Sequence, residues 1–110
     1  MIRATGTVLD RILSETRESV ARRREERPAS ELAPAAGAGG GRFREALAAP
    51  GIGVIAEFKR RSPSAGSLHE AAELASIVAA YERGGAVAAS ILTEEPNFGG
   101  SLEDLLAARR

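Results

Sequence analysis

The sequence contains no cysteine and no tryptophan, and it has one histidine and one tyrosine. The absence of cysteine excludes a disulfide framework and a thiolate metal site, and it is compatible with a reducing compartment. The single histidine, His69, has no second histidine with which to form a metal site or a catalytic triad, so we assign it no role. The chemistry of this chain therefore has to come from carboxylates, hydroxyls and basic side chains.

The sequence also lacks an excess of either charge, because fifteen basic residues balance fifteen acidic ones. This balance argues against a dedicated nucleic-acid binder. The arginines at positions 22–24 lie among glutamates, which favours a solvated helix face over a nucleic-acid patch. No signal peptide is recognisable, and no apolar run approaches the ~20 residues of a membrane span. We therefore expect a soluble, cytoplasmic protein that binds neither nucleic acid nor membrane.

Lysine is nearly absent: of the fifteen basic residues, only Lys59 is not arginine. It follows Glu57 by two positions in a short apolar run, so the two side chains of a strand there share one face. Lysine is a compact charge whose pKa changes on burial, which arginine cannot match. An ion pair on the inward face of a buried strand is costly unless it has a function. The pair is a candidate for acid–base chemistry and anion binding, with a structural ion pair as the alternative.

The first third of the chain has a helical pattern. Thr7 and Asp10 can cap a helix whose apolar residues follow one stripe until Pro28 ends it. Residues 33–41 are rich in glycine and alanine and indicate a flexible connector. Residues 42–47 predict a short helix that stops at Pro50.

The remainder of the chain alternates between strands and helices. Residues 54–59 and 87–93 are continuous apolar runs and predict buried strands. Residues 62–67 and 94–100 predict loops, and the apolar spacing from residue 74 to 81 predicts a helix. A last helix starts at Ser101, where Asp104 completes a pattern similar to a capping box. This order is typical of a parallel α/β sheet, and two strands alone would leave it incomplete. A small two-layer domain is the alternative.

In parallel α/β proteins, functional residues gather where the strands end. Glu57 and Lys59 lie at the end of the first predicted strand and Ser62 in the loop after it, and Glu94 and Phe98 follow the second. Ser62 could offer its hydroxyl to an oxyanion or could belong to an ordinary turn. Phe98 lies in a polar loop, where it could pack on a ligand ring or anchor the loop.

Two long motifs resemble one enzyme family. Residues 54–66 are similar to the first strand and loop of indole-3-glycerol phosphate synthase, and residues 89–101 to its second strand and loop. Residues 9–13 are similar to the extra N-terminal helix of that family, and residues 43–47 to the short helix before its barrel. Asn97 departs from the pattern, because an aromatic residue is common at that position.

The resemblance implies an α/β fold, the N-terminal part of a (βα)8 TIM barrel that in full has ~250 residues. Residues 1–50 would form an N-terminal helical extension with its connector, and residues 51–110 the first two βα units. The family converts 1-(2-carboxyphenylamino)-1-deoxyribulose 5-phosphate to indole-3-glycerol phosphate, with loss of carbon dioxide and water, in tryptophan biosynthesis. It needs no cofactor and no metal, and its partner is this small phosphorylated substrate. Association with other enzymes of that pathway is left open by the sequence.

The resemblance also implies roles for individual residues. Glu57 takes part in acid–base chemistry, and Lys59 contacts the anionic substrate and stabilises developing charge. Ser62 lines the substrate site, Phe98 flanks the anthranilate ring, and Glu94 lies near this pocket.

Other parts of the family's active site are not among these residues. A second lysine on the third strand, a later carboxylate and the phosphate-binding loops of the last strands are not in this sequence. We therefore expect a truncated enzyme that is inactive alone. The alternative is a non-catalytic half-barrel fragment that serves as a protein-interaction module.

Overall fold

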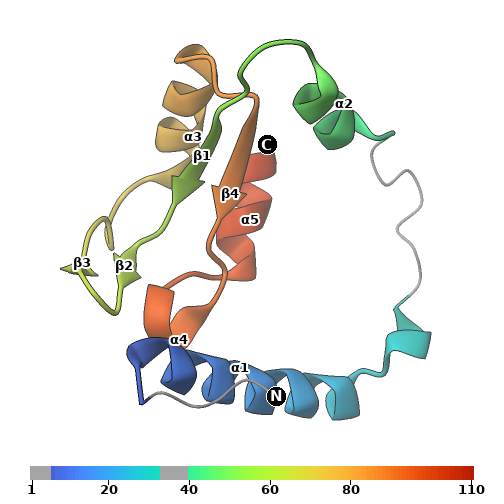
Figure 1. The fold of residues 1–110 in the computed structure, drawn as a ribbon, viewed down its shortest axis with the longest axis vertical. Coiled ribbons are helices and arrows are strands. Elements are labelled where there is room, and N and C mark those ends of the chain that lie inside the picture. The colour runs from blue at the N-terminus through green and yellow to red at the C-terminus, as the bar shows by residue number, and fades with distance from the viewer. Residues whose placement is uncertain (1–5, 33–39) are drawn as a thin grey trace. The chain divides into compact units, whose positions relative to one another are not determined.

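The computed structural model describes residues 6–32 and 40–110 (Figure 1). The chain divides into two compact units, residues 1–40 and 41–110. Most of the expected glycine- and alanine-rich connector, residues 33–39, lies outside the described residues. The expected domain boundary at residue 50 stays a prediction.

The first unit is built on helix α1 (Val8–Glu26). Its first turn is closed by the predicted capping box: the Thr7 hydroxyl accepts from the Asp10 amide at 3.3 Å, and the Asp10 carboxylate accepts from the Thr7 amide at 3.0 Å. The two bonds satisfy amides that have no partner inside the helix. The helix ends before Pro28, as predicted, and a short 3-10 helix, η1 (Ala29–Glu31), follows.

The second unit begins with helix α2 (Arg42–Ala48) and contains a parallel pair of strands, β1 (Ile55–Phe58) and β4 (Ala88–Ile91). Two further backbone hydrogen bonds extend the pairing beyond both ends. The Val87 amide donates to the Val54 carbonyl, and the Leu92 amide donates to the Phe58 carbonyl. Both predicted strands are therefore present, but they are not buried as expected: Phe58 is the buried residue of β1, and no residue of β4 is buried in the described chain.

The crossover between the strands runs through α3 (Leu74–Arg83), and α5 (Leu102–Arg109) follows β4. The order β1, α3, β4, α5 confirms the α/β class.

Two segments expected to be loops contain regular structure. Residues 61–67 form an antiparallel hairpin of β2 (Arg61–Ser62) and β3 (Gly66–Ser67), with Gly66 at a φ of +70°. Residues 95–98 form the short helix α4 (Glu95–Phe98), which the Glu94 side chain caps. Proline and glycine in these two segments led to the prediction of irregular loops. Hydrogen bonds between nearby side chains and the backbone order both segments instead.

The two faces of the parallel pair differ in their surroundings. Phe58 is 2% exposed and Leu74 of α3 is also buried, and they form the buried apolar core of the described residues. Helices α3 and α5 contact each other and β4, and Figure 1 shows them beside the two strands. Glu57 and Lys59 alternate with Phe58, so they project from the opposite face of β1.

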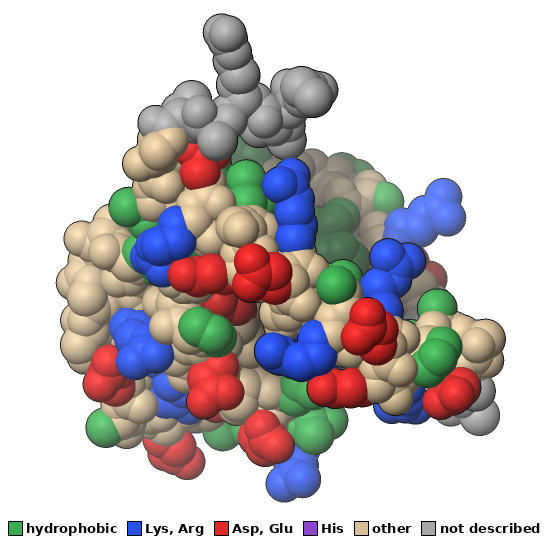
Figure 2. Space-filling view, turned by 90° about the horizontal axis from the view of Figure 1, so that it is seen from below, with side chains coloured by type: hydrophobic (Ala, Val, Ile, Leu, Met, Phe, Trp, Pro, Cys, Tyr) green, Lys and Arg blue, Asp and Glu red, His purple; other side chains and the backbone are tan. Residues whose placement is uncertain are grey.

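Many apolar side chains remain exposed in the described part of the chain. In the second unit they lie mainly before and within β1 and along α5: Ile52, Val54, Ile55, Leu102, Leu105 and Leu106. Acidic and basic side chains are interspersed over the described residues on the face seen in Figure 2, in keeping with the zero net charge. No helix within the described ranges is long and apolar enough to cross a membrane.

Candidate functional site

The predicted pair of Glu57 and Lys59 is present at the carboxyl end of β1. The Lys59 Nζ lies 3.1 Å from Glu57 Oε1, and the two side chains are 36% and 48% exposed. The pair is therefore accessible from solvent rather than buried. Exposed ion pairs contribute little to folding stability, so a stabilising role does not account for the contact between Glu57 and Lys59.

Ser90 is a third member of this cluster that the sequence analysis did not single out. It is paired with Glu57 in the register of β1 and β4, and its hydroxyl donates to Glu57 Oε2 at 3.3 Å. Each carboxylate oxygen thus has its own partner, Lys59 on one and Ser90 on the other. One feature of the sequence could have identified Ser90, because it is a polar residue inside the second apolar run. Its alignment with Glu57 depends on the register, which the sequence does not give.

The Tyr81 side chain, from α3, contacts the backbone of residue 57. Its hydroxyl donates to the Glu57 backbone carbonyl at 3.2 Å. Since Tyr81 lies in the helix that links the two strands, the crossover contacts the strand beside the candidate acid–base group.

The Ser62 hydroxyl takes part in the turn of the β2–β3 hairpin. It accepts from the Ala65 amide at 3.1 Å and lies 3.4 Å from the Ser64 hydroxyl. These contacts are those of an ordinary serine turn. A contact between Ser62 and substrate stays a prediction.

Glu94 has a clear local function as the cap of α4. Its carboxylate accepts from the Asn97 amide at 2.8 Å, from the Asn97 side chain at 2.8 Å and from the Phe98 amide at 3.1 Å. Asn97 is buried, and its side chain gives Glu94 an internal partner. These bonds fix the turn that carries Phe98. Substrate binding by Glu94 and by Phe98 stays a prediction.

Arg61 brings the two candidate loops together. Its Nη2 donates to the Glu95 carbonyl at 3.1 Å and to the Pro96 carbonyl at 3.2 Å. The hairpin after β1 therefore lies against α4, and Ser62 and Phe98 belong to neighbouring segments at the carboxyl ends of the strands.

Near the end of β1 lies another ion pair, less exposed and bidentate, that was not predicted from the sequence. Arg60 donates to Asp104 of α5 through Nε at 2.9 Å and through Nη2 at 2.6 Å, and their side chains are 18% and 12% exposed. The Arg60 guanidinium holds the pKa of Asp104 below its ordinary value, and Asp104 raises that of Arg60.

The predicted capping box at Ser101 is half right. The Ser101 hydroxyl accepts from the Asp104 amide, but the Asp104 carboxylate points to Arg60.

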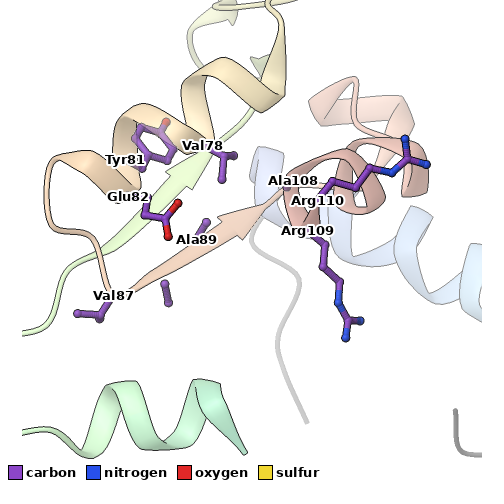
Figure 3. Close-up of a pocket in the computed structure, with 9 residues that line it drawn as sticks. Val78, Tyr81, Glu82, Val87, Ala89, Ala108, Arg109 and Arg110 are labelled. Atoms are coloured by element: carbon purple, nitrogen blue, oxygen red, sulfur yellow. The ribbon is translucent and has the colours of Figure 1, made fainter. Parts of the chain in front are cut away.

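A cavity of about 330 Å³ lies elsewhere, at the amino end of β4 between α3 and α5 (Figure 3). It contains none of the predicted site residues. Its lining includes Val78, Tyr81, Val87, Ala89 and Arg109. Across the described ranges, acidic residues and His69 nowhere gather in a group of three or more that could hold a metal ion.

Comparison with known proteins places the chain in a family. The family model described as indole-3-glycerol phosphate synthase matches residues 9–110. The protein named indole-3-glycerol phosphate synthase from Mycobacterium avium (strain 104) is 52% identical over 106 residues, 94% of this chain and 39% of the relative. Those from Mycobacterium leprae (strain TN) and Rhodococcus opacus (strain B4) are 51% and 50% identical with the same coverage. The chain thus spans 39% of the length of these relatives. Because the family model matches nearly all of its residues, the chain belongs to the indole-3-glycerol phosphate synthase family.

Proposed function

We propose that this chain supplies the first part of an indole-3-glycerol phosphate synthase with a (βα)8 barrel. Residues 1–50 form the N-terminal extension, and residues 51–110 form the first two βα units. The substrate is the phosphorylated 1-(2-carboxyphenylamino)-1-deoxyribulose, and the reaction takes place in the cytoplasm. The observation that carries the proposal is the accessible pair of Glu57 and Lys59, 3.1 Å apart at the end of β1.

The pair suits the chemistry of the proposed reaction. Ring closure onto a carbonyl needs a group that moves a proton, and a carboxylate with a fixed orientation serves this purpose. Glu57 is oriented through both of its oxygens, by Lys59 and by Ser90. The Lys59 ammonium provides a compact positive charge for the substrate carboxylate and for charge that develops as carbon dioxide leaves.

The two neighbouring loops complete this half of the site. Phe98, on the turn capped by Glu94, flanks the aromatic ring of the substrate. Ser62, at the end of the hairpin, lines the same space. The contact of Arg61 with the carbonyls of α4 keeps these loops together.

The chain alone should be inactive. The family's second lysine, its later carboxylate and its phosphate-binding loops belong to the part that this chain does not span. Loss of one proton donor costs about 10²–10⁴ in rate, and loss of the phosphate site adds to this. We therefore expect no measurable product from the 110 residues by themselves.

The test is to supply the remaining part of the barrel from a relative. The chain is joined in frame to the part of the Mycobacterium avium relative that lies beyond the matched segment, which gives what we call the joined protein. We expect the joined protein to form indole-3-glycerol phosphate and the isolated chain to form none. Glu57→Gln in the joined protein is the matched control, because it removes the carboxylate and keeps its size.

Two outcomes would contradict the proposal. One is a joined protein that folds cooperatively but forms no product, while the intact relative is active in the same assay. The other is full activity in the Glu57→Gln variant. Product formation by the isolated chain would separately refute the expected inactivity.

A further inference from the structure

Arg60 is the most highly connected side chain at the end of β1. Its Nε and Nη2 bind both oxygens of Asp104, and its Nη1 donates to the carbonyls of Glu70 at 3.0 Å and Ala72 at 3.1 Å. The guanidinium carbon lies 5.4 Å from the centre of the Phe58 ring. One side chain thus joins β1 to the segment before α3 and to the first turn of α5.

Only arginine can make this set of contacts. The planar guanidinium offers five donors in a fixed fork, which matches a carboxylate in a bidentate manner while leaving donors for carbonyls. A lysine at this position would keep the charge but would present a single nitrogen on a flexible stem. Shape, and not charge alone, is what the site requires of residue 60.

The location of Arg60 links this network to the candidate catalytic pair. Arg60 directly follows Lys59, and its guanidinium lies over the Phe58 ring, which is on the face of β1 opposite to that of Glu57. The Arg60 carbonyl also accepts from the amides of Leu68 at 2.9 Å and His69 at 2.8 Å. Side chain and backbone of residue 60 are therefore both fixed, immediately after the residue whose ammonium lies beside Glu57.

We propose that Arg60 and Asp104 form a positioning pair that holds the end of β1 so that the Lys59 ammonium stays beside Glu57. The inference rests on the proposed function, in which Lys59 contacts the substrate. Arg60 acts through Lys59: the substrate is contacted by Lys59, and Arg60 fixes the backbone from which Lys59 projects. A small displacement of a reacting group is enough to lower a rate strongly.

The first test uses Arg60→Lys in the joined protein. Because misplacement by about 1 Å can cost about 10²-fold, we expect kcat/KM to fall by about 10- to 100-fold. The control is Arg22→Lys, since Arg22 pairs with Glu26 at 3.9 Å on the surface of α1 with side chains 69% and 65% exposed. That variant should keep its activity within about twofold.

The decisive measurement repeats Arg60→Lys in a Lys59→Met background. If Arg60 acts through Lys59, its replacement should change the residual kcat/KM by less than about threefold there, because coupled residues are not additive. An equal loss in both backgrounds would overturn the proposal, since it would show that Arg60 only supports the fold. Thermal melting of each variant shows that the comparison is made between folded proteins.

An independent readout does not depend on activity. Lysine labelled with ¹⁵N and ¹³C is incorporated into the joined protein, and the Lys59 side-chain signals are identified by their loss in Lys59→Met. Glu57→Gln gives the reference shift for a broken contact. We expect Arg60→Gln to move the Lys59 signals in the same direction, and Arg22→Gln to leave them in place. Unmoved Lys59 signals in a folded Arg60→Gln variant would overturn the proposal even if the joined protein proved inactive.

Discussion

Glu57 of β1 and Ser90 of β4 face each other across the parallel pair, and the Ser90 hydroxyl donates to Glu57 Oε2 at 3.3 Å. The other oxygen of the same carboxylate lies 3.1 Å from the Lys59 ammonium. The carboxylate is thus held from two directions, by the residue directly after its own strand and by a residue of the next strand. Its orientation depends on the register between the strands, which connects the fold directly to the candidate chemistry.

The first prediction concerns Ser90. In the joined protein, Ser90→Ala should lower kcat by about two- to tenfold, which corresponds to one hydrogen bond that orients Glu57. The melting temperature should change little, because the lost bond is near the surface. Ser76→Ala is the matched control, since the Ser76 hydroxyl also donates to a carboxylate, that of Glu73, away from the site. Equal activity of the two variants would show that Ser90 does not orient Glu57.

The second prediction concerns the identity of Lys59. Lys59→Arg preserves the positive charge but replaces a compact ammonium with a wide planar fork. We expect kcat/KM of the joined protein to fall by at least about 10²-fold, on the scale of a lost catalytic group. The melting temperature should be unchanged, because the Lys59 side chain is partly exposed. Activity of Lys59→Arg within threefold of the parent would mean that any cation suffices at this position.

Elements with a strong local signal were predictable from the sequence. The capping residues Thr7 and Asp10 located the start of α1, and the apolar spacing from residue 74 located α3. The two apolar runs located β1 and β4, although Phe58 is the buried residue of these strands in the described chain. Helix α4 was missed because it is only four residues long and depends on the Glu94 side chain for its cap.

The candidate site was only half predictable, for a physical reason. Glu57 and Lys59 are close in sequence and share a face, so strand geometry alone places them together. Arg60 and Asp104 are 44 positions apart, and their contact follows from the packing of α5 against the sheet. Arg60 and Arg61 are chemically identical neighbours in the sequence, yet Arg60 binds Asp104 while Arg61 binds carbonyls of α4. Side-chain chemistry alone could not distinguish them.

The third prediction is a dependence of stability on pH that comes from Asp104. Arg60 lowers the pKa of Asp104 in the folded state, below the ordinary value of about 3.9 that applies when the chain is unfolded. The stabilisation is therefore complete above about pH 4 and is lost as the pH falls through the folded-state pKa. The difference in unfolding free energy between the joined protein and its Asp104→Asn variant should be constant near neutral pH and should shrink below about pH 4.

Denaturant unfolding at a series of pH values from neutral to acidic measures this difference. The direction in which this difference changes with pH is the informative result. A carboxylate with a raised pKa would give the opposite trend, in which the difference grows as the pH falls. A difference that does not change with pH would show that the Asp104 carboxylate gains nothing from its contact with Arg60.

The fourth prediction concerns Gly100, which follows α4. Gly100 is buried, its amide donates to the Glu94 carbonyl at 3.0 Å, and a Cβ at this position would collide with the backbone carbonyl of Leu92. Because that neighbour is backbone and cannot rotate away, Gly100→Ala should lower the unfolding free energy by about 1–3 kcal/mol. It should also lower kcat/KM, since the turn that carries Phe98 has to shift.

Gly40→Ala is the control, as a Cβ there would meet no atom within 4 Å and the change should stay within about 0.5 kcal/mol. Equal stability of the two variants in denaturant unfolding of the joined protein would mean that the close approach of Gly100 to Leu92 does not constrain this turn.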